Sequence, residues 1–275
     1  MPAGTKERFN EMLFSTGTFA TGSANDYYKE VSNGKISLKG DIFGPYHMPR
    51  NISEYAGTNV KHPNGTQSTF PNSQTMAQDA VTKAKDDITF SRYDNDRNTF
   101  VDALIIVHAG RGAEQTKVVT DIWSIKWTLP QVFTQNSTNV YAFLTLPEDA
   151  KTGVSVHELG HLLFGWPDLY DRTKVTFGIG NWCLMASGEW LGGGDSPCHP
   201  SAWCKVNQRW VDLFTETAPR DTTIGPVQTT HDVRRVWKAG QSESREYYLL
   251  ENRQQIGKDA AIPGPGLLSE YTAAS

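Results

Sequence analysis

The sequence predicts an α+β fold in which a mixed sheet with helices comes first and an irregular lobe with short strands follows. Two apolar runs, "VDALIIVHAG" and "NVYAFLTLP", have the composition of buried strands, and helical patterns precede and follow them. The later part of the chain is richer in tryptophan, glycine and turn residues. A chain of 275 residues can form one large domain or two lobes. We divide it into an N-terminal lobe, residues 1–164, and a C-terminal lobe, residues 165–275.

The elements before the first buried strand follow from local patterns. The segment "NDYYKEVSNG" predicts a short helix that stops at an Asn-Gly pair, and "KISLKGDIF" alternates in polarity like a half-buried strand. Residues 45–74 are rich in Pro, Asn, Gly, Ser and Thr without sustained periodicity, which predicts a long surface excursion. Apolar residues then recur at helical spacing between Gln74 and Asp87.

The elements after the second buried strand begin with one helix that carries a motif. This helix should begin near Thr152 and end before Pro167, because the proline ring cannot continue it. Two further strands are expected at "DVRRVWKAG" and "REYYLLENR".

Charge and hydropathy exclude two classes of partner. The net charge of −4 provides no field that would attract nucleic acid or anionic lipid. No apolar run approaches the about 20 residues that a membrane-spanning helix needs, and the start "MPAGTKERFN" lacks the apolar core of a signal peptide. We therefore expect no nucleic-acid partner and no membrane span.

The three cysteines, Cys183, Cys198 and Cys204, lie close together in the sequence. A bridge from Cys198 to Cys204 is geometrically reasonable in an oxidising compartment. Three reduced, buried thiols are an equally good interpretation.

The segment "VHELGHLLFGWPDLYD" carries the strongest chemical signal. His157 and His161 are four residues apart, so in a helix they lie on one face and can offer two imidazole nitrogens to one metal ion. Glu158 would then lie within reach of a metal-bound water without being a ligand, as a general base requires. The alternative is a helix whose histidines are satisfied by backbone carbonyls or carboxylates.

A third metal ligand is expected directly after the motif helix. Gly165 permits a sharp turn and Pro167 ends the helix, so the chain should return Asp168 toward the metal. Asp171 is the nearest competitor for this role.

The stretch "DNDRNTFVD" resembles a calcium-binding loop. Asp94, Asp96, Asn98 and Asp102 place oxygens at positions 1, 3, 5 and 9 of such a loop. Thr99 occupies position 6, where a glycine is wanted, and no glutamate stands at position 12. The stretch is either a weakened or reshaped calcium site or a solvated acidic turn.

These segments together resemble the immune inhibitor A family of secreted zinc metallopeptidases, in the zincin class. The resemblance rests on "HELGHLLFGWPDLYD", "NWCLMASGEW", "YDNDRNTFVDALIIVHAGRGAE", "IWSIKW", and "YYLLENRQ" with "PGPGLL", in the family's order from about Phe9 to Leu268. It implies a zincin-like, two-lobed catalytic domain and a secreted, extracellular endopeptidase that acts on protein or peptide substrates. The site residues that it implies are the zinc ligands His157, His161 and Asp168, the base Glu158, and the methionine of a turn under the metal, Met185.

Two departures from the family pattern qualify this resemblance. Asp168 falls eleven rather than ten positions after His157. The chain also ends in "GLLSEYTAAS", where the family continues into another strand, so we expect a shortened C-terminal lobe. The rival hypothesis is a non-catalytic extracellular binding module in which a metal only stabilises the fold.

The residues that could line a substrate cleft come both before and after the histidine motif in the sequence. The stretch "HAGRGAE" follows a strand, and its glycines would let a peptide approach the backbone closely. The alternatives are a second bound ion for His108 and Glu114, a tight turn with exposed polar residues, and, for the tryptophans, packing in the core. The candidate cleft residues are His108, Gly110, Glu114, Trp166 and Trp190.

Overall fold

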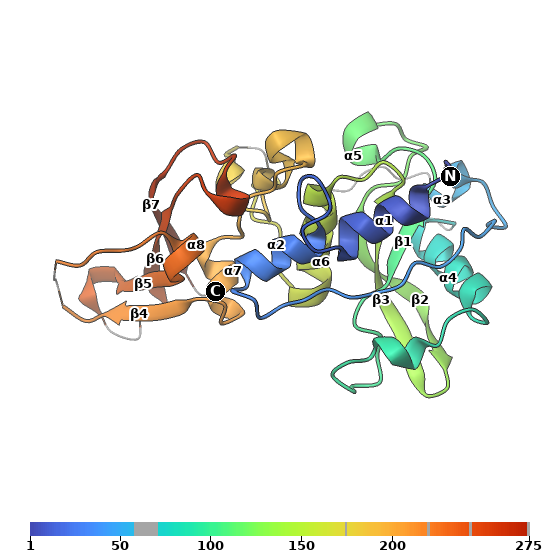
Figure 1. Ribbon diagram of the computed structural model, residues 1–275, viewed down its shortest axis with the longest axis horizontal. Helices are drawn as coiled ribbons and strands as arrows, with labels where there is room; N and C mark the ends of the chain where they lie inside the picture. Colours follow the sequence, from blue (N-terminus) through green and yellow to red (C-terminus); the bar gives the residue numbers. More distant parts are fainter. Residues whose placement is uncertain (58–70, 174, 219–220, 242–243, 274–275) are drawn as a thin grey trace. The chain divides into compact units, whose positions relative to one another are not determined.

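A computed structural model describes residues 1–57, 71–173, 175–218, 221–241 and 244–273. The chain clusters into two compact units, one of Met1–Leu13 with Lys39–Gly165 and the other of Phe14–Leu38 with Trp166–Ser275. Each unit contains helices and one mixed sheet (Figure 1). The α+β fold predicted from the sequence is therefore confirmed. Part of the predicted surface excursion, residues 58–70, lies outside the described residues.

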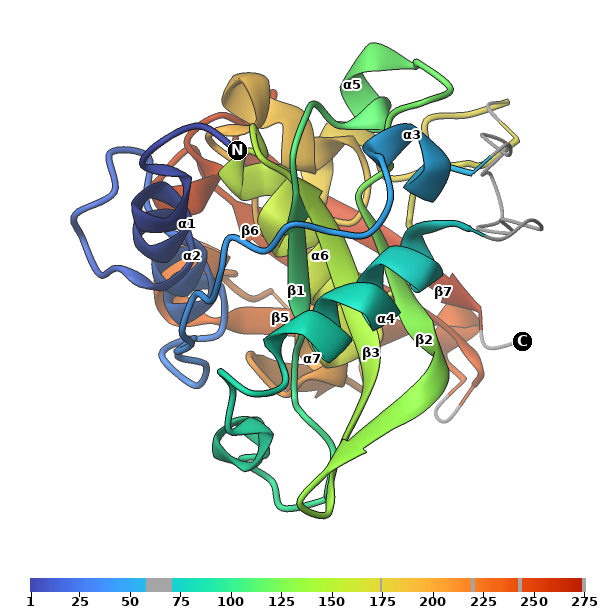
Figure 2. The same cartoon turned by 90° about the vertical axis from the view of Figure 1, so that its right-hand side faces the viewer.

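The first unit is built on a three-stranded sheet between two helices. Strand β3 (Thr138–Pro147) lies in the middle, parallel to β1 (Ile105–His108) and antiparallel to β2 (Ile125–Gln135). Helices α4 (Ser73–Ala84) and α6 (Thr152–Phe164) cover opposite faces of this sheet (Figure 2). The core on the α4 side contains Ala77, Val81, Phe90, Leu129, Val140 and Phe143.

Helix α1 (Thr5–Phe14) holds the connection from β3 to α6 in place. The Arg8 guanidinium donates hydrogen bonds to the backbone carbonyls of Glu148, at 3.1 Å, and of Ala150. Both carbonyls precede the first residue of α6, so this contact fixes the position at which the motif helix begins. The other helices of this unit are short: α3 (Ile52–Tyr55), η1 (Phe90–Tyr93) and α5 (Ala113–Thr116).

The second unit contains a four-stranded sheet in the order β4–β5–β6–β7. Strands β4 (Asp212–Glu216) and β5 (Asp232–Trp237) are parallel, and β6 (Glu246–Arg253) pairs antiparallel with both β5 and β7 (Gly266–Ala273). One core cluster consists of Ala202, Val227, Val233 and Leu249. The helices are α2 (Ala24–Val31), η2 (Gly180–Trp182), η3 (Ser187–Gly194), α7 (Ala202–Asn207), α8 (Val227–Thr230), η4 (Lys238–Gly240) and η5 (Gly257–Asp259).

Most of the elements predicted from periodicity are present, and one prediction is wrong. The helices α2, α4 and α6 and the strands β1, β3, β5 and β6 lie where the sequence places them. Residues 35–43, all of them described, form no strand. The N–H groups of Ile36 and Leu38 donate instead to the side-chain oxygens of Ser32 and Asn25, both at 2.9 Å. Because these donors are satisfied by side chains, they need no neighbouring strand.

The three cysteines are buried and free in the described part of the chain, so the bridge from Cys198 to Cys204 is not formed. The structure agrees with the alternative of three reduced thiols. Among the described residues, no helix combines the length and the apolar character that crossing a membrane requires.

A buried ionic cluster connects three elements of the second unit. The Arg253 guanidinium on β6 is fully buried and donates to both carboxylate oxygens of Asp259 in η5, and to Glu251 Oε1 at 3.0 Å. Lys205 of α7 donates to the other oxygen of Glu251. Burial acts to raise the pKa of Asp259, but the charges of His199 and Arg253 outweigh it and hold the pKa below its ordinary value.

Replacing Asp259 with asparagine should reduce the free energy of unfolding of this unit by about 3–5 kcal/mol, because Arg253 would keep its buried charge without a full partner. This destabilisation should have its full size above about pH 4, where the carboxyl group is ionised in both the folded and the unfolded chain. It should shrink as the pH falls further, because the depressed pKa stabilises only the ionised carboxylate. Urea unfolding at several pH values measures it.

The matched control is Glu246→Gln, which breaks the exposed ion pair between Lys238 and Glu246. This variant should unfold almost as the natural chain does, because water and salt screen an exposed pair. If both variants lost the same free energy of unfolding, the buried cluster would contribute no more to stability than an exposed ion pair does.

Candidate metal site

Helix α6 ends as the sequence predicts. Its C-cap, Gly165, has φ of +66°, a left-handed conformation that glycine adopts without strain, and its N–H donates to the carbonyl of Gly160. Pro167 follows two residues later, so the chain leaves the helix axis before Asp168.

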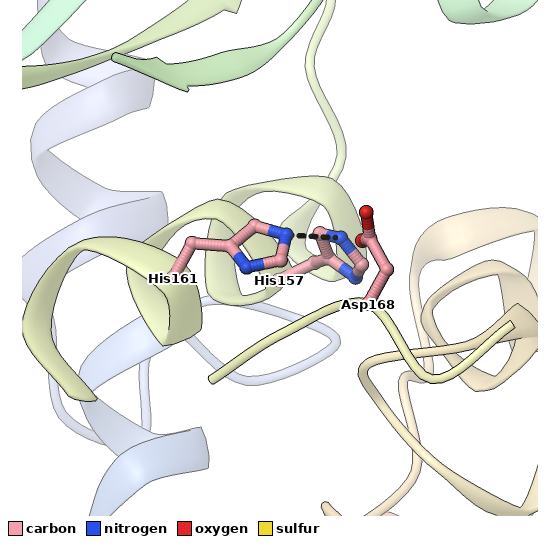
Figure 3. Close-up of side chains that lie close together, drawn as sticks. All are labelled: His157, His161 and Asp168. Atoms are coloured by element: carbon pink, nitrogen blue, oxygen red, sulfur yellow. Dashed lines mark hydrogen bonds between the residues drawn. The ribbon is translucent and has the colours of Figure 1, made fainter. Parts of the chain in front are cut away.

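Two histidines on α6 direct the same ring nitrogen to one point. The Nε2 atoms of His157 and His161 are 3.1 Å apart, and the ring centroids are 4.7 Å apart (Figure 3). Two nitrogens bound at about 2.0–2.1 Å to one tetrahedral ion would lie about 3.3 Å apart, so the pair fits a shared metal ion. His157 and Glu158 are both buried, with 5% and 7% of their surfaces exposed. His161 is half-buried, so this part of the helix places one nitrogen and a carboxylate away from water and a second nitrogen closer to the surface.

Asp168 completes a group of possible ligands. A ligand atom of Asp168 lies within 4.8 Å of ligand atoms of both His157 and His161. Two side chains hold its carboxylate: Arg172 Nη2 donates to Asp168 Oδ2 at 2.6 Å, and the Tyr170 hydroxyl also donates to this carboxylate. A ligand carboxylate that is held in this way keeps a fixed orientation.

The backbone next to Asp168 is also fixed. The N–H of Leu169 donates to the carbonyl of Met185 at 2.6 Å. Met185 is fully buried, and its role as the methionine of a turn under the metal stays a prediction. Sequence reasoning did not find Arg172 or Tyr170. The opposite charges of Asp168 and Arg172, four positions apart, are the signal that could have indicated the first contact.

Asp171, the competing candidate ligand, has other partners. Its carboxylate accepts hydrogen bonds from the backbone N–H and the hydroxyl of Thr173, at 2.8 and 2.6 Å, and from the same two groups of Thr176, at 2.8 and 3.1 Å. These hydrogen bonds lower the pKa of Asp171, and the bond from the Thr173 hydroxyl makes the largest contribution. The geometry gives this carboxylate the role of organising a loop.

The predicted cleft residues of the first unit are placed as follows. His108 ends β1 and is buried, with Nδ1 2.9 Å from the carbonyl oxygen of Ala109, and burial lowers its pKa. Gly110 has φ of +83°, which favours glycine. The Glu114 carboxylate accepts hydrogen bonds from the N–H and the hydroxyl of Ser124, at 3.1 and 2.9 Å. Glu114 therefore braces the chain before β2.

The two tryptophans differ in exposure. Trp166 is buried and packs edge-on against Trp210, with ring centroids 5.2 Å apart. Trp190 lies in η3 and is half-buried. Contact of either ring with substrate stays a prediction.

The predicted calcium loop is folded around its own carboxylates. Ligand atoms of Asp94, Asp96 and Asp102 lie within 4.8 Å of one another. Asp94 accepts hydrogen bonds from the N–H groups of Asn98, at 3.0 Å, and Thr99, at 3.1 Å. Thr99 has φ of +73°, so it adopts the conformation that a glycine would take without strain at position 6.

An α+β scaffold that presents two histidines and a glutamate on one buried helix has the architecture of a metallopeptidase catalytic domain. Residues 4–214 match the family model described as immune inhibitor A peptidase M6, catalytic domain. The chain belongs to this peptidase family.

A curated relative agrees with this assignment. The chain is 29% identical over 222 residues to immune inhibitor A of Bacillus thuringiensis subsp. alesti. The aligned region covers 68% of this chain and 32% of the relative, so the chain spans about a third of that protein's length. The family match ends at residue 214, within β4, so strands β5, β6 and β7 lie beyond it.

Proposed function

We propose that the chain is a secreted, zinc-dependent endopeptidase that hydrolyses peptide bonds of extended protein substrates. The observation that carries the proposal is the pair of Nε2 atoms 3.1 Å apart on a buried helix, with Glu158 next to His157. Two neutral imidazoles and one carboxylate form a ligand set that suits zinc and leaves a coordination position for water. His157, His161 and Asp168 would hold the ion.

The bound zinc would supply Lewis acidity, which lowers the pKa of a coordinated water toward about 7 and polarises the scissile carbonyl. Glu158 accepts the proton of the attacking water and passes it to the nitrogen of the leaving amine. Arg172 and Tyr170 hold the Asp168 carboxylate, so that its orientation does not change during turnover.

Hydrolysis of casein with and without a zinc chelator tests this function. We expect activity that the chelator abolishes and that added zinc restores. The rival hypothesis, a non-catalytic extracellular binding module, predicts no hydrolysis under any of these conditions even when zinc is bound. The extracellular location is tested separately, by comparing the protein in the culture medium with that in the cells.

We further propose that the loop around Asp94, Asp96, Asn98 and Asp102 binds calcium in a structural role. The convergence of three carboxylates supports the proposal. The left-handed Thr99 opposes tight binding, since such a conformation costs a β-branched residue on the order of 1–3 kcal/mol. The site should therefore be weak.

Calcium titration to millimolar concentrations should raise the melting temperature, because a ligand that binds only the folded state stabilises it. The rise should vanish in the double variant Asp94→Ala, Asp96→Ala, and the zinc content should stay the same in both proteins. Differential scanning fluorimetry measures the shift. A flat titration of the natural chain would leave the solvated acidic turn as the correct interpretation.

A further inference from the structure

In the loop of residues 171–178, the described residues 171–173 and 175–178 make several hydrogen bonds at the base of the loop. Besides the four hydrogen bonds to Asp171, the N–H of Gly178 donates to the Thr176 hydroxyl at 3.2 Å, and the N–H of Ile179 donates to the carbonyl of Leu169 at 3.1 Å. Gly178 has φ of +59°, and a Cβ there would lie 2.9 Å from the Cα of Tyr170. The loop therefore closes against the two residues that directly follow Asp168.

This loop carries two large apolar side chains that the described part of its own unit does not cover. Val175 is 84% exposed and Phe177 is 85% exposed, the highest values among the large apolar side chains that the structure describes. Burying such a side chain would contribute about 1.5–3 kcal/mol. Single exposed apolar residues are common, but here two of them are two positions apart in a loop that has four hydrogen bonds from backbone N–H groups and two from threonine hydroxyls.

We propose that Val175 and Phe177 determine substrate specificity by contacting an apolar side chain of the substrate close to the scissile bond. The inference rests on the proposed peptidase function. A substrate whose carbonyl reaches the metal site extends about 3.4 Å per residue, so side chains next to the scissile bond pass near the segment that begins at Asp168. Two uncharged, apolar side chains favour an aromatic or branched aliphatic partner over a polar or charged one. Asp171 acts as the positioning residue that holds this loop.

The test compares cleavage sites. The natural chain and the double variant Val175→Ser, Phe177→Ser digest denatured casein, and mass spectrometry identifies the bonds that are cut. The natural chain should cut next to large apolar residues. The double variant should lose about 10–200-fold in kcat/KM on a peptide with phenylalanine at the preferred position, and it should retain activity on the matched peptide with glycine there.

The control is Leu267→Ser, which removes a 60% exposed apolar side chain from β7 of the same unit. Its cleavage profile should match that of the natural chain. A more conservative variant, Phe177→Leu, should keep the preference for apolar residues with a smaller loss. Zinc content and melting temperature should be the same in all of these proteins, which separates a change in specificity from a damaged site.

The experiment distinguishes a failure of the specificity role from a failure of the peptidase function. If the natural chain cleaves casein but the double variant keeps the same profile and the same kcat/KM ratio, the specificity role is wrong and the peptidase function stands. If the natural chain with bound zinc cleaves nothing, the proposed function fails and this inference fails with it.

Discussion

Replacing Glu158 with glutamine should reduce peptide hydrolysis by about 10²–10⁴-fold. The amide has nearly the same shape as the carboxylate but cannot accept the proton of the attacking water. Because glutamine is nearly isosteric with glutamate, the variant should change neither the helix nor the two imidazoles, although Glu158 is only 7% exposed. Casein hydrolysis measures the loss, and elemental analysis of the same sample should find zinc unchanged.

Glu246→Gln serves as the matched control, because 41% of this side chain on β6 is exposed and its ion pair with Lys238 lies at the surface. It should hydrolyse casein at the rate of the natural chain. Near-normal turnover in Glu158→Gln would show that another group is the base.

Replacing Asp168 with alanine should weaken zinc binding by more than the about 10–100-fold that loss of an outer-shell partner typically costs. Asp168 brings a ligand atom within 4.8 Å of ligand atoms of both histidines, and Arg172 and Tyr170 hold its carboxylate. Competition with a chromophoric chelator gives the affinity, and this measurement does not depend on catalysis.

Asp171→Ala should leave zinc affinity close to that of the natural chain, because its carboxylate is engaged with Thr173 and Thr176. It should instead loosen the 171–178 loop and weaken the preference for apolar substrate residues. Equal losses of zinc affinity in the two variants, or a larger loss for Asp171→Ala, would reassign the third ligand.

The features that the sequence predicted correctly are those with local causes. The positions of His157 and His161 on one helical face follow from four-residue spacing, and the end of α6 follows from Gly165 and Pro167. The strands β1 and β3 were recognisable because both are apolar along most of their length, although β1 is only partly buried.

The features that it did not predict depend on which groups the folded chain brings together, at short as well as long separation in the sequence. Alternation at residues 35–43 suggested a strand. The N–H groups of Ile36 and Leu38 instead donate to the side chains of Ser32 and Asn25, so they are not available to a neighbouring strand. Strand β7 exists because it pairs with β6, a contact that its own alternation does not specify. The salt bridge from Arg172 to Asp168 requires the turn after the helix to be known first.

The buried cluster of Lys205, Glu251, Arg253 and Asp259 limits how this sequence can change over generations. A leucine in the core can become isoleucine or methionine at modest cost, so such positions can drift one step at a time. Each charge in the cluster is compensated by another, so a single replacement leaves a buried charge behind, while a simultaneous exchange for apolar residues of similar volume can be neutral. Engineering of this unit should therefore exchange the four residues as a set.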